Sequence, residues 1–158
     1  MKFSVNQQDL QKSLSYCQGV IEKRSTLPIL SNILLEASNS QLTITATDLD
    51  LIFIHKFSNV EVHEEGKTTT SSSIMYDIVR KIPAGNKINF SNPSENKLKL
   101  DSEKSLFNLN CISASEFPLT DENFNENEFY LKSKELLKLL NKCKFSISND
   151  ETRHYLSG

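Results

Sequence analysis

The stretch KFSVNQQDLQKSLSYC, residues Lys2–Cys17, decides the fold because it joins a strand pattern directly to a helix pattern. Residues 2–5 alternate as in a strand, Asn6 is a typical helix-capping residue, and apolar side chains then follow at helical spacing. The stretch returns 126 positions later, without a gap, as EFYLKSKELLKLLNKC (128–143). The matched pairs include Phe3 with Phe129, Val5 with Leu131, Leu10 with Leu136, Leu14 with Leu140 and Cys17 with Cys143. A fixed offset across two kinds of element predicts a duplicated domain.

Within the first copy, the pattern of one strand, one helix and three strands occurs twice, in residues 1–58 and 67–110. The three later strands are expected at 29–36, 41–47 and 49–57 in the first half, and at 87–91, 97–101 and 105–110 in the second. The second helix is expected to carry Ile74, Ile78 and Ile82 on one face, and His63–Gly66 is expected to be a polar turn. The predicted fold class is α+β, a domain of two β-α-β-β-β units with pseudo-twofold symmetry.

The domain boundary is expected in an acidic, Asn-rich segment without periodicity, residues 112–127. Residues 1–120 are therefore predicted to be the first domain, and 121–158 the linker and the truncated beginning of the second copy. The N-terminus lacks the apolar run of a signal peptide, and no stretch reaches membrane-spanning length. Three widely spaced cysteines without a CxxC pair predict a reduced, cytoplasmic protein.

The charges of the chain are distributed unevenly. The three helical candidates, 6–18, 73–83 and 132–144, carry eight lysines and arginines against three carboxylates, a net charge of +5. Because the whole chain carries −2, the remainder carries −7. Basic helices in an otherwise acidic protein are typical of a protein whose helices face a polyanion. The alternative is that the helices carry lysine for solubility alone.

Catalytic candidates are few. Asp48 and Asp50 form a DxD pair that could hold a divalent cation, with His55 near in sequence, although His55 would lie on the opposite face of a strand. An aspartate at the start of a strand more often serves a turn. Hydrolase, zinc-protease and phosphate-loop motifs are lacking. The sequence therefore predicts a protein that is not an enzyme and needs no cofactor, with a metal-dependent enzyme as one alternative and a protein-binding adaptor as another.

Two loops carry cations where a phosphate could be reached. Lys23 and Arg24 lie between a helix end and a strand, and Arg153, His154 and Tyr155 combine cations with an aromatic ring. Under the 126-residue offset, the two loops occupy comparable places in successive domains. Such an array can follow a nucleic-acid backbone through contacts that carry no sequence information.

Four motifs together resemble the bacterial replicative sliding clamp, the beta subunit of DNA polymerase III. They are R-x-T-L-P-I-L (Arg24–Leu30), T-D-L (Thr47–Leu49), F-P (Phe117–Pro118) and F-S-x-S…R-x-Y-L-x-G (Phe145–Gly158). The resemblance covers the whole chain in order. It implies a subunit of three such domains, and two subunits closing head to tail into a ring around double-stranded DNA. The helices would line the hole and the sheets would form the outside. The implied partners are DNA polymerase III and the clamp loader subunits.

The resemblance also assigns roles to individual residues. It implies DNA contacts for Lys23, Arg24, Arg80, Asn149, Arg153, His154 and Tyr155. Ser73 departs from relatives that carry a basic residue at its position. Leu156 and Gly158 match the edge of a hydrophobic cleft for partner peptides. Phe107 and Leu109 match positions that meet the other subunit, although one of the two could instead face its own core.

Overall fold

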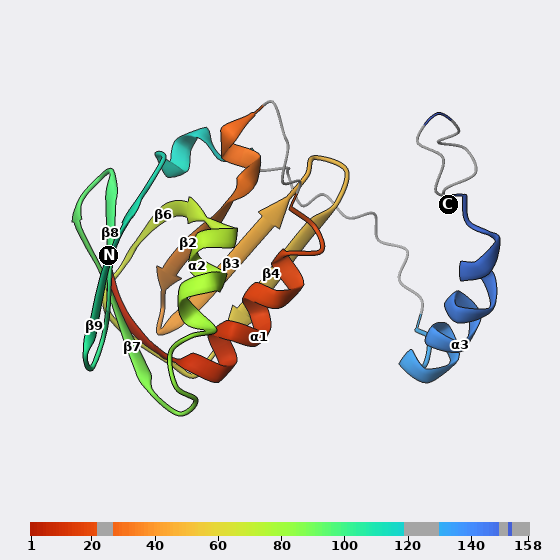
Figure 1. The fold of residues 1–158 in the computed structure, drawn as a ribbon, viewed down its shortest axis with the longest axis horizontal. Helices are drawn as coiled ribbons and strands as arrows, with labels where there is room; N and C mark the ends of the chain where they lie inside the picture. The colour runs from red at the N-terminus through yellow and green to blue at the C-terminus, as the bar shows by residue number, and fades with distance from the viewer. Residues whose placement is uncertain (22–26, 119–129, 149–151, 153–158) are drawn as a thin grey trace. The chain divides into compact units, whose positions relative to one another are not determined.

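The computed structural model describes residues 1–21, 27–118, 130–148 and 152. The chain divides into two compact units, Met1–Thr120 and Asp121–Gly158. Figure 1 shows the first unit as two curved sheets with two helices packed against them. Its strands and helices are β1 (Lys2–Asn6), α1 (Gln7–Cys17), β2 (Asn32–Ser38), β3 (Gln41–Thr47), β4 (Ile52–Phe57), β5 (Val60–Glu64), β6 (Gly66–Ser71), α2 (Ser72–Val79), β7 (Lys87–Ser94), β8 (Lys97–Ser102) and β9 (Ser105–Asn110).

The two halves of the first unit exchange their first strands. One sheet has the order β5-β1-β7-β8-β9 and the other β4-β3-β2-β6, with every pair antiparallel. β1 of the first half therefore pairs with β7 of the second, where Phe3 lies opposite Phe90. β6 of the second half pairs with β2 of the first, where Thr69 lies opposite Leu34. This exchange confirms the predicted α+β fold of two related units, and it makes each sheet depend on both halves.

The two helices lie side by side and antiparallel, as Figure 1 shows. The side chain of Gln7, at the start of α1, donates to the carbonyl oxygen of Val79 at the end of α2, over 2.8 Å. At the other end, the side chain of Gln18 donates to Oγ of Ser72, also over 2.8 Å. Because Gln7 and Ser72 are both buried, these bonds give buried polar groups a partner where the two helices meet, while Oε1 of Gln7 has no partner among the described residues.

Each helix buries one stripe of side chains in the core. The oxygen of the Asn6 side chain accepts the backbone N–H of Gln8 and caps α1, and Leu10, Leu14 and Cys17 are buried as predicted. The expected face of α2 is only partly the buried one. Met75 and Val79 are fully buried and Ile82, just beyond the end of the helix, is 7% exposed, whereas Ile78 is half-buried and Ile74 is 53% exposed. Isoleucines four residues apart fit helical periodicity equally well, so spacing alone did not identify the buried stripe.

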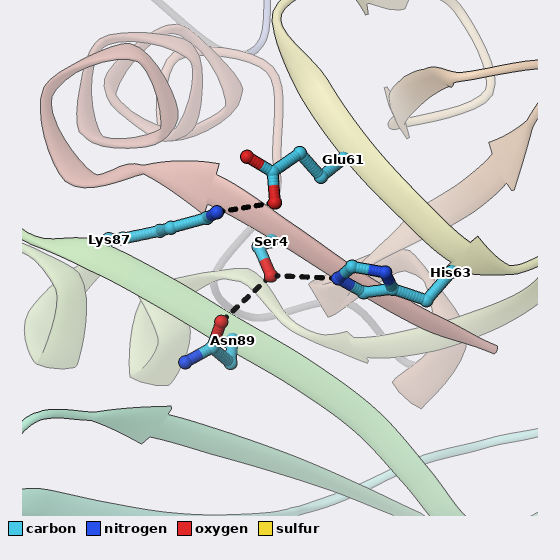
Figure 2. A network of polar contacts seen from close by, with 5 residues as sticks. All are labelled: Ser4, Glu61, His63, Lys87 and Asn89. Carbon is cyan, nitrogen blue, oxygen red and sulfur yellow. Dashed lines mark hydrogen bonds and ion pairs between the residues drawn. The ribbon is translucent and has the colours of Figure 1, made fainter.

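The predicted polar turn at His63–Gly66 is also wrong in part, because His63 and Glu64 belong to β5. β5 is an edge strand that pairs only with β1. Figure 2 shows the polar side chains that fasten it. The Ser4 hydroxyl lies 3.4 Å from Nε2 of His63 and donates to Oδ1 of Asn89 over 2.7 Å, and Lys87 pairs with Glu61. These contacts come from three strands far apart in sequence.

Residues of two of the four motifs are buried around the β4-β3-β2-β6 sheet. The 3₁₀ turn Pro28–Ser31 packs on β2, and the 3₁₀ turn Ala114–Glu116 packs near β6. Leu30 and Phe117 from these segments are 4% and 3% exposed. The hydroxyl of Thr69 donates to the carbonyl oxygen of Ile112 over 2.6 Å, which holds the second segment on β6. Leu30 of the first motif and Phe117 of the F-P motif therefore have a structural role.

The second unit contains the helix α3 (Ser133–Cys143) followed by a 3₁₀ turn, Lys144–Ser146. The helix is predicted correctly, but the strand that the repeat predicts before it is not present among the described residues, since Tyr130 and Leu131 lie outside any strand. A strand needs a neighbouring strand for its hydrogen bonds, and the described part of this unit offers none. No helix in the described ranges is long and apolar enough to cross a membrane.

Candidate functional site

The exposed surface of α1 and α2 is only weakly basic. It carries Lys12, Arg80 and Lys81 against Asp9 and Asp77, a net charge of +1. The other described residues of the first unit carry seven lysines against ten carboxylates. The predicted segregation of charge is therefore present but modest in this unit. Most of the basic excess lies around α3, with five lysines between 132 and 144 against Glu135.

Arg80 is the one predicted DNA-contacting residue that the described ranges contain. It is half exposed and directly follows α2, where the negative end of the helix dipole favours a cation. Its Nη2 lies 3.0 Å from Oδ1 of Asp77, and its Cζ lies 5.8 Å from the ring centroid of Tyr76. This arrangement was not predicted, although the spacing of three residues between Asp77 and Arg80 is a recognised signal for a helical ion pair.

The other residues predicted to contact DNA or partner peptides lie outside the described residues. They are Lys23, Arg24, Asn149, Arg153, His154, Tyr155, Leu156 and Gly158. Their roles stay predictions.

Phe107 and Leu109, the two residues predicted to meet another subunit, both lie on β9 but differ in burial. Leu109 is 6% exposed and belongs to the core, which fits the alternative that one of the pair faces inward. Phe107 is half-buried and lines an open cleft of about 530 Å³ between α2 and the β8–β9 hairpin. The cleft is lined by charged as well as apolar side chains, and its apolar residues are Ile74, Ile78, Ile82, Pro83 and Phe107. Among the described strands β9 also forms an edge of its sheet, so one side of its backbone has no strand partner there.

Asp48 has a structural role in the turn before β4. Its Oδ1 accepts the backbone N–H groups of Asp50 and Leu51, over 3.0 Å and 2.6 Å. This turn holds Leu49 in the left-handed backbone region, with φ of 84°. The predicted strand 49–57 therefore starts later, at Ile52. This bonding matches the reading of Asp48 as a turn residue.

His55 faces α1. Its Nδ1 lies 3.0 Å from Oγ of Ser13, and its ring packs edge-on against Phe57 with centroids 4.5 Å apart. No group of three or more metal-ligating side chains occurs in the described part of the chain. His55 therefore serves the packing of α1 on β4.

The thiols differ in environment. Cys17 is fully buried, and burial raises the pKa of its thiol from 9.0 to about 12. Burial also raises the pKa of the Cys111 thiol, whereas Cys143 is exposed. A thiol nucleophile needs a lowered pKa, so Cys17 and Cys111 fit core packing.

Comparison with known proteins identifies one family. A match to the family described as DNA polymerase III beta subunit, N-terminal domain, covers residues 1–121. The chain is 37% identical over 160 residues to the beta sliding clamp of Caulobacter vibrioides, covering 100% of this chain and 42% of that protein. It is 35% identical over 158 residues to the beta sliding clamp of Escherichia coli strain K12, covering 43% of that protein. The chain thus spans about two fifths of the length of these relatives.

Solved structures give the same result. The beta sliding clamp of Caulobacter crescentus superimposes with a TM-score of 0.93 at 36% identity, over 100% of this chain and 42% of that one. The DNA polymerase III subunit beta of Bartonella birtlesii, solved bound to griselimycin, gives a TM-score of 0.94 at 36% identity, again over 100% and 42%.

Proposed function

Because the chain belongs to the DNA polymerase III beta subunit family, we propose that it is the front part of a sliding clamp, a non-catalytic processivity factor that encircles duplex DNA. One observation carries this proposal. The helices α1 and α2 lie together, and their exposed side chains carry more cations than carboxylates, while the rest of the described unit is acidic. A ring holds DNA by enclosure, so its contacts need only be electrostatic and independent of sequence. An acidic exterior would disfavour DNA there.

Residues 1–120 would be the first clamp domain, and 121–158 the linker and the beginning of the second. The 126-residue repeat supports this division, since α3 repeats the pattern of α1. Leu10 and Leu14 are buried in the first unit, whereas their counterparts Leu136 and Leu140 are 41% and 59% exposed. The remaining strands of a complete second domain would cover them, as the strands of the first unit cover α1.

The DNA-facing residues would be Arg80 from α2 and, outside the described ranges, Lys23, Arg24, Asn149, Arg153, His154 and Tyr155. Leu156 and Gly158 would border the cleft for partner peptides. DNA polymerase III and the clamp loader subunits would be the partners, and the protein would act in the cytoplasm without a cofactor.

The edge formed by α2 and β9 would meet the second subunit of a homodimeric ring. The open cleft beside Phe107 supports this assignment, because an apolar side chain from a partner could fill it. The free backbone of β9 could pair with a partner strand at the same time. Leu109 would act indirectly, by holding β9 against the core.

The test is a chimera in which residues 1–121 of this chain replace the corresponding domain of the Caulobacter vibrioides beta sliding clamp. Loaded onto nicked circular DNA, the chimera should stay bound at moderate salt, and it should be lost once the circle is linearised, because a ring slides off a free end. Equal loss from both forms, with the parent clamp retained on circles in parallel, would dispose of the proposal.

A further inference from the structure

Arg80 is engaged on two sides before any ligand arrives. Asp77 holds one guanidinium nitrogen at 3.0 Å, and the ring of Tyr76 lies 5.8 Å from the guanidinium carbon. Tyr76 is itself partly buried against the core, so it forms a fixed support. The guanidinium is therefore held along the last turn of α2, with N–H donors that no other residue of the described ranges contacts and that could bind another anion.

The neighbouring helix presents its cation differently. Lys12 of α1 is exposed and forms no ion pair within the described residues. Thus α1 offers a free cation, while α2 offers one that a carboxylate already contacts. Because the exposed face of the two helices has a net charge of only +1, removing one carboxylate would double that charge.

We propose that Asp77 is a positioning residue that competes with DNA phosphate for Arg80 and keeps that contact weak. A half-exposed pair of this kind is only slightly stable, so a phosphate can displace the carboxylate and the carboxylate can recapture the guanidinium. Tyr76 keeps the guanidinium in place during the exchange. Fast exchange suits a protein that must move along DNA. The inference rests on the proposed function and assigns a regulator to the Arg80 contact.

The experiment measures binding of the complete 158-residue chain to a fluorescent mixed-sequence duplex by anisotropy, over a series of low salt concentrations. Asp77→Asn should bind about threefold more tightly than the wild type, since both repulsion and competition are removed. The slope of log K against log salt should steepen by up to about 0.9, the value for one further phosphate contact. Arg80→Gln should weaken binding and flatten the slope.

Asp9→Asn is the matched control, because Asp9 is an exposed carboxylate on α1 without an ion pair in the described ranges. It removes the same charge from the same face without releasing an arginine. The gain from Asp77→Asn should exceed the gain from Asp9→Asn, and the excess should vanish when Arg80→Gln is also present. Equal gains in the two variants, or an excess that survives Arg80→Gln, would overturn the inference.

Asp77 also lines the α2/β9 cleft, so the oligomeric state of each variant is measured by sedimentation velocity. A gain in DNA binding that appears only with a change in oligomeric state would also overturn the inference.

The Nε–Hε NMR signal of Arg80 gives a second readout, because it should shift on Asp77→Asn without DNA and move further when the duplex is added. If the wild type and all variants fail to bind DNA at the lowest salt, the inference fails, whereas the proposed function is decided separately by the chimera on circular and linear DNA. If the wild type binds DNA but Asp77→Asn and Asp9→Asn raise the affinity equally, only the inference fails.

Discussion

The α1/β4 edge and the α2/β9 edge of the first unit have the same backbone plan but different surfaces. His55 in β4 lies opposite Ile44, and Phe107 in β9 lies opposite Leu100, so the two residues occupy matching places. At the first edge, His55 bonds to Ser13, and Tyr16 covers Phe53 with centroids 5.9 Å apart.

At the second edge, Ile78 stands at the position of Ser13 and lines an open cleft with Phe107. The internal symmetry therefore supplied two similar edges, and the side chains closed one and left the other open. The first edge is closed in the sense that α1 contacts His55 and Phe53, although Ile52 and Ile54 on its strand are 43% and 37% exposed. An open apolar edge is suited to a partner.

The largest loss of stability should come from a core position on β9. Leu109→Ala should lower the free energy of unfolding by about 3 kcal/mol, because it leaves a cavity in the core. Phe107→Ala should cost only about 1 kcal/mol, since part of that side chain already faces solvent. Urea denaturation monitored by circular dichroism gives both values.

Leu106→Ala is the control for this comparison, because Leu106 is 56% exposed on the same strand and its loss should change stability by less than about 0.5 kcal/mol. Similar losses for Leu109→Ala and Phe107→Ala would mean that β9 does not separate a core position from a surface position.

The α1 half of the core contains a buried thiol that the α2 half lacks at the matching place, because Cys17 of α1 corresponds to Ile82 after α2. The pKa of the Cys17 thiol is raised in the folded protein to about 12, so folding favours the protonated form. Its contribution to stability is complete below about pH 9, the value for an exposed thiol, and is lost as the pH rises toward 12. The loss should approach 1.4 kcal/mol per pH unit in this window.

Chemical denaturation of the wild type and Cys17→Ala at pH 8 to 11 isolates this effect, since other groups titrate equally in both proteins. The stability difference should narrow as the pH rises. A difference independent of pH would show that the Cys17 site is accessible to water.

The smallest effect concerns the bond between Ser13 and His55. Ser13→Ala should cost about 1 kcal/mol, because it leaves the partly buried imidazole without this partner. Ser15→Ala is the control, since the Ser15 hydroxyl is exposed and bonds only to the carbonyl oxygen of Lys12 in its own helix. Thermal unfolding should separate the two variants by a few degrees. If they unfold together, the bond does not hold the edge closed.

The sequence predicted the features that local patterns encode. The helix that starts at Asn6, its buried stripe of Leu10, Leu14 and Cys17, and the alternating strand Gln41–Thr47 follow from periodicity and capping. The repeat of these patterns also predicted the internal symmetry. The family resemblance added the expected roles of Arg80 and Phe107.

The features that were missed depend on residues far apart in sequence. β5 is a strand because it pairs with β1 and because Lys87 forms an ion pair with Glu61. Its own sequence, a short run with two valines, does not predict a strand. The buried stripe of α2 was missed because its isoleucines compete with Met75 and Val79 for the same spacing. The α2/β9 cleft exists only after Phe107 is brought beside Ile78. No pattern within either element encodes that contact.

The central claim is that the chain is a clamp domain whose open edge receives another subunit, and sedimentation equilibrium of the chimera tests it most directly. The chimera with the wild-type edge should be a dimer. Phe107→Asp should shift it to monomer by placing a charge in the apolar cleft, while His55→Asp at the matching closed edge should leave the dimer intact. A wild-type chimera that stays monomeric, or a Phe107→Asp chimera that remains as dimeric as its parent, would contradict the account.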